Sequence, residues 1–136
     1  MRRLLAALVV FASAFAIATP DAWAGSPHFI ASSLSTSTSG STISVSGKEA
    51  GLGNESQVHI VLTATAACIN GGGKHPKAVN QTSVTASGTF PVQNGKANFT
   101  LTATAAFTPD CSPPMTVAFS DVMLTDTTNN ISVTLR

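Results

Sequence analysis

The sequence predicts an all-β protein built from two packed antiparallel sheets. Apolar and polar residues alternate along residues 57–68, which is the two-residue period of a strand with one face on a core. The hexapeptide LTATAA at 62–67 recurs at 101–106 with the same parity. Short alternating segments separated by turn residues make up most of the remaining chain. Together these observations predict an immunoglobulin-like antiparallel β-sandwich of about seven strands, with an N-terminal signal helix; a closed barrel is the alternative.

Residues 1–24 have the organisation of a cleavable signal peptide. Arg2 and Arg3 precede an apolar run at 4–18, and the segment ends in Ala22-Trp23-Ala24, a small-x-small cleavage site. The apolar run is shorter than the about 20 residues that cross a bilayer, which disfavours the alternative of a membrane anchor. Cleavage after Ala24 leaves residues 25–136 as a single secreted domain with no membrane span.

The predicted mature chain is neutral and has few aromatic side chains. Five basic residues balance five acidic ones without a basic cluster, which argues against binding to nucleic acid or acidic lipid. Trp23 leaves with the signal peptide and the chain contains no Tyr. Sugar-binding modules and antibody-like paratopes usually rely on exposed Trp and Tyr, so the composition disfavours both. Abundant Ser and Thr suit strands whose outer faces carry hydroxyl groups.

Cys68 and Cys111 are expected to form one disulfide, because the chain is predicted to be exported. The loop that it would close is long, and the chain-entropy model assigns it about 4 kcal/mol. Metal ligation and an intermolecular bridge are the alternatives. In an up-and-down count, the strands at 57–67 and 96–106 run the same way, with one strand between them. Their C-terminal ends then lie at one end of the sandwich, which brings the two cysteines together.

Before the central strand, the pattern predicts a short edge strand at residues 28–33 and then a flexible Ser/Thr/Gly-rich turn up to residue 41. Residues 42–46 alternate clearly and predict a second strand, with Ile43 and Val45 facing the core. Three glycines in residues 47–54 predict a loop there.

After the central strand, residues 69–80 form a long connection, and residues 83–92 alternate again. Gly88 and Pro91 place this second segment at a bulge or a sheet edge. Asn94-Gly95 predicts a type I′ hairpin turn.

The repeated strand follows that turn and extends to about residue 107. Residues 108–114 contain three prolines and cannot form regular structure. The apolar parity changes within residues 115–125, which predicts a bulge near Ser120-Asp121. Residues 130–136 form the final strand.

The end of the sandwich that carries the disulfide is the predicted binding site, because loops on rigid scaffolds commonly carry function. Lys74, His75, Lys77 and Asp110 lie on the two loops that the disulfide would join. An inert, capped end is equally compatible with the sequence. The glycine run at 71–73 lacks the spacing of a phosphate-binding loop, and the histidines are not spaced as a metal pair. No metal and no cofactor are therefore expected.

No enzyme motif is present, and the chain is expected not to be an enzyme. The G-x-S-x-G elbow of a hydrolase is absent. A glycosidase-type carboxylate pair would lack an aromatic platform for its sugar. Four Asn-x-Ser/Thr matches to the N-glycosylation pattern are a weak signal in a chain so rich in Ser and Thr: Asn54, Asn80, Asn98 and Asn130.

Two segments resemble small exported bacterial β-sandwich proteins of unassigned function: SGSTISVSGKEAGLGN at 39–54 and TSVTASGTFPVQNGKANFTL at 82–101. More loosely, the chain is similar to neocarzinostatin-type apoproteins, which are Ala/Thr/Gly/Ser-rich seven-strand sandwiches that bind an enediyne chromophore. This second resemblance implies a sandwich with a ligand cleft. The chain has one long-loop cysteine pair where those carriers have two short-loop disulfides, so the resemblance assigns no binding residues.

The sequence thus favours a secreted, non-enzymatic structural or interaction module whose partner is an unknown protein or cell-surface component. A small-molecule carrier with an apolar cleft is the alternative, and a hydrolase with an unrecognised site is the third hypothesis. A concave pocket of about 300 Å³ or more would favour the carrier.

Overall fold

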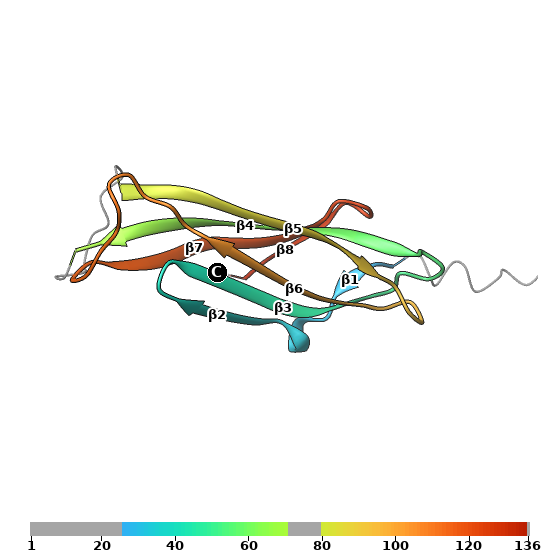
Figure 1. The fold of residues 1–136 in the computed structure, drawn as a ribbon. Helices are drawn as coiled ribbons and strands as arrows, with labels where there is room; N and C mark the ends of the chain where they lie inside the picture. Colours follow the sequence, from blue (N-terminus) through green and yellow to red (C-terminus); the bar gives the residue numbers. More distant parts are fainter. Residues whose placement is uncertain (1–25, 71–79, 136) are drawn as a thin grey trace, which may run out of the picture.

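The computed structural model describes residues 26–70 and 80–135, which form an elongated two-layer β-sandwich (Figure 1). One layer, sheet A, contains β1 (His28–Phe29), β2 (Ser35–Ser39), β3 (Thr42–Ala50) and β6 (Ala97–Thr104). The other layer, sheet B, has the order β5 (Gln81–Pro91), β4 (Gln57–Ile69), β7 (Thr116–Asp126) and β8 (Ile131–Thr134). All pairings are antiparallel. The predicted all-β sandwich is confirmed.

Two segments singled out in the sequence, the predicted signal peptide at 1–24 and most of the connection at 69–80, lie outside the described residues. The described ranges contain no helix with the length and hydropathy that a membrane crossing requires. A single 3-10 turn, η2 (Ala31–Ser33), separates β1 from β2. Because β6 pairs along β3 as far as Glu49, β1 and β2 share the opposite edge of β3.

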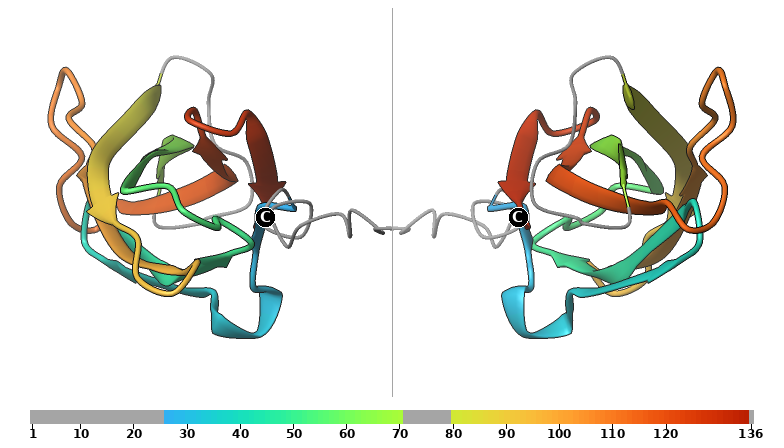
Figure 2. Two further views of the ribbon diagram at one scale, coloured as in Figure 1. Left: turned by 90° about the vertical axis from the view of Figure 1, so that its right-hand side faces the viewer. Right: turned by 90° about the vertical axis from the view of Figure 1, so that its left-hand side faces the viewer.

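The core lies between the two layers, which face one another when the sandwich is viewed along its length (Figure 2). Each long strand buries alternate residues, as a two-residue period requires. Leu62 and Leu101, which are equivalent positions of the repeated hexapeptide, are 0% and 5% exposed. The two repeats therefore lie on opposite sheets and both turn their leucine into one shared core.

The Asn94-Gly95 turn has the conformation that the sequence predicts. Asn94 and Gly95 have φ values of 55° and 75°, and Gln93 pairs with Lys96 across the turn. Positive φ at both central residues is the requirement of a type I′ turn. The turn leads from β5 in sheet B to β6 in sheet A. Since β5 is antiparallel to both neighbours in sequence, β4 and β6 run in the same direction, as expected.

The predicted bulge in β7 is confirmed. The pairing of β4 with β7 shifts register between Thr63 and Thr65, and Asp121 at the bulge has a φ of 52°. An extra residue in one strand reverses which side chains face inward. Phe119 before the bulge and Val122 after it are consequently both buried. β5 lies at the edge of sheet B, as the presence of Gly88 and Pro91 in its sequence predicts.

Three predictions for the first half of the chain differ from the structure. The Ser/Thr segment expected to be a flexible turn forms β2, which pairs with residues 42–46 of β3. The backbone of β2 forms hydrogen bonds with the edge of β3. These bonds stabilise the strand although its sequence has no alternation of apolar and polar residues. The loop expected from residue 47 begins only after Ala50, because β3 continues alongside β6 as far as Glu49. The expected edge strand at 28–33 is reduced to β1 and η2.

Candidate functional site

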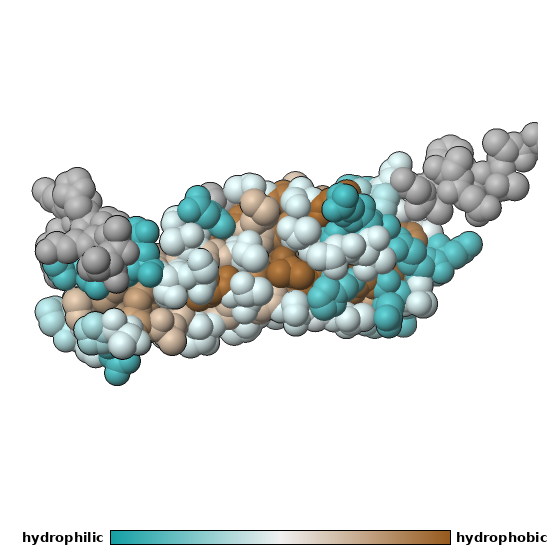
Figure 3. Space-filling model, turned by 90° about the horizontal axis from the view of Figure 1, so that it is seen from above, coloured by the Kyte–Doolittle hydropathy of each residue, from teal (hydrophilic) through white to brown (hydrophobic). Residues whose placement is uncertain are grey.

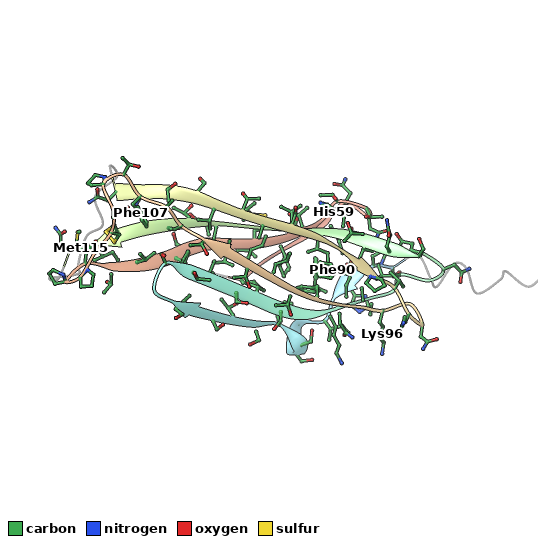
Figure 4. All side chains as sticks on the ribbon, viewed as in Figure 1. His59, Phe90, Lys96, Phe107 and Met115 are labelled. Carbon is green, nitrogen blue, oxygen red and sulfur yellow. A yellow bond between two sulfur atoms is a disulfide. The ribbon has the colours of Figure 1, made fainter. Side chains whose placement is uncertain are left out.

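Cys68 and Cys111 form the predicted disulfide, with their Cα atoms 5.7 Å apart. Cys68 lies near the C-terminal end of β4, and Cys111 lies in the segment between β6 and β7. The sulfur atom of Met115 is 3.7 Å from the sulfur of Cys68. Figure 4 shows Met115 and Phe107 together at this end of the sandwich, while Lys96 and Phe90 lie toward the other end. This region is called the disulfide end below.

The structure shows only part of the predicted binding site at the disulfide end. Lys74, His75 and Lys77 lie outside the described residues. Asp110 is exposed and directly precedes the bridged Cys111. The convergence of these four side chains therefore stays a prediction.

A hollow of about 420 Å³ opens at the disulfide end. One wall is formed by the turn between β2 and β3, which contributes Gly40 and Ser41. The other wall contains the apolar side chains of Pro113, Met115 and Val117. This volume lies within the range of small-molecule sites, which starts at about 300 Å³.

The outer face of sheet A carries nine hydroxyl side chains in three rows, which the strand register aligns across β2, β3 and β6. Directly opposite residues of antiparallel strands point to the same side of the sheet. Ile43 and Val45, which lie between the hydroxyl residues of β3, are fully buried, so the rows face outward. This surface is called the hydroxyl face. Its rows are Ser35, Ser46 and Thr100; Ser37, Ser44 and Thr102; and Ser39, Thr42 and Thr104.

Hydrogen bonds connect some of these hydroxyl groups across the strands. The side-chain oxygens of Thr42 and Thr104 are 3.0 Å apart, and those of Ser44 and Thr102 are also 3.0 Å apart. Each hydroxyl has one donor and two acceptor positions, so bonded pairs keep free positions for a ligand. Neighbouring strands are about 4.8 Å apart and alternate residues about 6.7 Å apart along a strand. The hydroxyl face is thus a regular uncharged array of donors and acceptors.

The outer face of sheet B is less uniform. Val61 is half-buried there, and Met123 is 37% exposed. Figure 3 shows the molecule from the side on which β5 and β4 lie uppermost in Figure 1, and brown hydrophobic patches appear among the pale residues. Sheet B also carries outward hydroxyl groups, including the row Ser83, Thr65 and Ser120, but His59, Val61 and Met123 interrupt them. The three rows of sheet A contain hydroxyl side chains alone.

Sequence reasoning missed the hydroxyl face. The alternation in STSTS at 35–39 is visible in the sequence, but Ser and Thr are also typical of flexible segments. The signal that identifies a face is the register between three strands, and residues 35–46 are far in sequence from residues 100–104. Sequence alone does not give that register.

A pair of buried acidic side chains lies at the end of the sandwich opposite the disulfide. Glu49 of β3 and Asp126 of β7 are both 0% exposed, and they come from different sheets. Asp126 accepts hydrogen bonds from the backbone N–H of Thr128 at 2.7 Å and of Asn129 at 3.0 Å. The side-chain amide of Asn129 donates a third at 2.7 Å. As a carboxylate, Glu49 has no hydrogen-bond partner for either oxygen among the described residues.

The environment shifts the pKa values of the two groups in opposite directions. The pKa of Glu49 is raised from 4.5 to about 9, chiefly by burial, and the hydrogen bond and charge of Asp126 and the charge of Glu55 contribute to this rise. Burial alone would raise the pKa of Asp126 as well. Hydrogen bonds from Glu49, Asn129 and the backbone of Thr128 outweigh burial and hold that pKa below its ordinary value of 3.8. These opposite directions favour the neutral form of Glu49 and the ionised form of Asp126.

In the described ranges, no three or more His, Cys, Asp or Glu side chains are grouped so that they could hold a metal ion. His59 lies on the outer face of sheet B, where its Nδ1 is 3.1 Å from the hydroxyl oxygen of Thr89. His28 is exposed, and its Nδ1 donates to the carbonyl oxygen of Ser26. These two histidines are thus engaged with neighbouring polar groups at the surface.

In comparisons with known proteins, no family model, no curated protein and no solved structure matches this chain. The resemblance to exported bacterial sandwiches and to neocarzinostatin-type apoproteins stays a prediction.

Proposed function

We propose that this chain is an exported, non-enzymatic interaction module that binds a neutral polysaccharide through the hydroxyl face. The observation that carries the proposal is the register of β2, β3 and β6, which aligns nine hydroxyl groups in three rows without a charged side chain among them. The disulfide supports export, because such bridges persist mainly in oxidising compartments outside the cytosol.

The mature chain lacks the Trp and Tyr side chains on which sugar-binding modules usually stack their ligands, so the proposed contact relies on hydrogen bonds alone. The hydroxyl face offers the donors and acceptors that an uncharged polymer of sugars can pair with. A polysaccharide presents hydroxyl groups at repeated intervals, and each of them can donate to or accept from a Ser or Thr hydroxyl. A single hydrogen bond contributes only about 0.5–1.5 kcal/mol net, so useful affinity requires several formed together. The three rows provide that repetition. No ion is desolvated when the two surfaces meet, which removes a large cost of binding.

Binding to insoluble neutral polysaccharides tests the proposal. We expect the protein to be depleted from solution by at least one of cellulose, chitin and an insoluble α-glucan. Because the contact is uncharged, added salt should change the bound fraction little. Ser44→Lys, at the centre of the hydroxyl face, is expected to weaken retention at least about tenfold, since a buried unpaired charge is costly.

Thr63→Lys is the matched control, because Thr63 lies at the centre of the outer face of sheet B. It should bind as the unchanged protein does. Circular dichroism spectra and melting temperatures of both variants verify that they fold. The proposal is wrong if the unchanged protein binds none of the three polymers, or if the two lysine variants lose binding equally.

A small-molecule carrier is the second candidate, and the hollow of about 420 Å³ at the disulfide end favours it. We expect a neutral apolar dye such as Nile red to increase in fluorescence with the protein and to lose this signal in Met115→Asp, which places a charge in the apolar wall. Met123→Asp makes the same change on the exposed face of sheet B and should leave the signal unchanged. No signal with the unchanged protein would reject the carrier.

A further inference from the structure

The end of the sandwich opposite the disulfide, called the loop end, is built around the two buried carboxyl groups. Glu49 lies in β3 between Phe29 of β1 and Ala97 of β6, so it is central in sheet A. Asp126 is the last residue of β7 and lies between β4 and β8 in sheet B. Neither side chain is exposed. The two groups therefore lie between the layers out of contact with bulk solvent, close enough to form a hydrogen bond with one another.

Two ionised carboxylates are unstable in this position. Removal of a carboxylate from water is costly unless hydrogen bonds and an opposite charge compensate for it, and like charges at short range add to the cost. Asp126 has three N–H donors from Thr128 and Asn129, whereas ionised Glu49 has none among the described residues. A proton on Glu49 removes its charge and provides a donor toward Asp126.

We propose that Glu49 and Asp126 share one proton across the interface between the sheets, and that this shared proton is a pH-sensitive latch for the loop end. The inference is independent of what the hydroxyl face binds. Loss of the proton leaves two negative charges between the layers and separates them at this end. The other end stays closed by the disulfide between Cys68 and Cys111.

The latch extends from Asp126 into the surrounding loops. The turn that Asp126 organises is bonded to β4, because the N–H of Thr127 donates to the carbonyl oxygen of His59 at 3.0 Å. The N–H of His59 in turn donates to the hydroxyl of Thr128 at 2.9 Å. Movement of Asp126 away from Glu49 would therefore disturb both β4 and the turn before β8.

No cation on the neighbouring elements replaces the proton. Glu55, in the connection from β3 to β4, adds a further negative charge. His28 on β1, Lys48 on β3 and Lys96 before β6 are exposed, and His59 on β4 lies on the outer face of sheet B. None of these four donates a hydrogen bond to Glu49 in the described part of the chain. The proton is thus the group that compensates the pair.

The direction of the pH effect follows from the pKa of Glu49 in the two states. The unfolded chain loses this proton near pH 4.5, whereas the folded chain keeps it until about pH 9. Between these values the folded state binds one more proton, so the unfolding equilibrium constant rises about tenfold per pH unit. Asp126 acts in the opposite sense, because its pKa lies below 3.8, and its contribution is lost only as the pH falls through that lower pKa. Stability is therefore greatest in mildly acidic solution.

Urea unfolding at several pH values, with the disulfide intact, tests the latch. From pH 5 to pH 8 we expect the unfolding constant of the unchanged protein to rise about 1000-fold, one factor of ten per pH unit. Glu49→Gln keeps the shape and a donor toward Asp126 but cannot ionise, so this rise should disappear. Glu55→Gln is the control, because Glu55 is only half-buried, and it should keep the slope of the unchanged protein.

A second measurement uses the unchanged protein and does not depend on the folding of a variant. Infrared spectra at pH 7 should retain the carbonyl stretch of one protonated carboxylic acid. Amide hydrogen exchange should accelerate at residues 127–130 as the pH approaches 9, beyond its intrinsic pH dependence, and not at the disulfide end. The latch is refuted if no protonated carboxyl remains at pH 7, or if the unchanged protein and Glu49→Gln have the same pH slope. Recovery of stability by added calcium at pH 8 would also refute it, because a cation and not a proton would then bridge the pair.

Discussion

Replacement of both bridged cysteines, Cys68→Ser together with Cys111→Ser, is expected to lower the free energy of unfolding by about 4 kcal/mol. The bridge joins residues separated by 43 positions, and its removal gives the unfolded chain back the conformational freedom of that loop. A small domain has only about 5–15 kcal/mol of stability in total. The melting temperature should fall by roughly 15 °C or more, measured by urea and thermal unfolding.

The same experiment shows whether the bridge acts through the unfolded chain. Reduction of the unchanged protein should reproduce the loss, whereas Ser112→Ala, an exposed neighbour in the same loop, should leave stability unchanged. The changed cysteines lie at the disulfide end. Amide hydrogen exchange in the turn at 127–130 should therefore accelerate only as much as the loss in the global free energy of unfolding requires. A loss below about 1 kcal/mol would contradict the loop-entropy account.

Asp126→Ala is expected to destabilise the protein by about 3–5 kcal/mol, because several buried polar groups would lose their hydrogen-bond partner at once. Three N–H groups of Thr128 and Asn129 would lose their acceptor. Protonated Glu49 would lose the group to which it donates. Buried polar groups without partners cost about 1–3 kcal/mol each, so the effect combines a broken turn with a broken contact between the sheets.

Chemical denaturation at pH 6 measures this loss against two further variants. Asp110→Ala removes an exposed carboxylate from a loop and should change the free energy of unfolding by no more than about 0.5 kcal/mol. Asn129→Ala removes the side-chain donor to Asp126 and should cost about 1 kcal/mol. If Asp126→Ala is as stable as Asp110→Ala, the backbone alone holds the turn, and Asp126 has no structural role.

The strands that form the centre of the core could be read from local patterns. Alternation along residues 57–68 and 97–104 predicts which side chains are buried, because a strand directs successive side chains to opposite faces. The Asn94-Gly95 turn is equally local, since few residues other than Asn and Gly adopt positive φ at low cost. The disulfide was expected because the chain has two cysteines and is predicted to be exported, although it joins residues 43 positions apart. The strands and the turn depend on residues close in sequence.

The hydroxyl face and the buried acid pair depend on residues that are distant in the chain. β2 has no apolar period, and its strand conformation comes from pairing with β3, so its sequence resembles a flexible turn. Glu49 resembles a surface charge in a glycine-rich loop until β6 and the opposite sheet enclose it. Alternating patterns thus identified the long strands and their core-facing sides. Packing determined which strands pair, in which register they pair, and which polar side chains become buried. Each of these is a relation between segments that the chain brings together only when it folds.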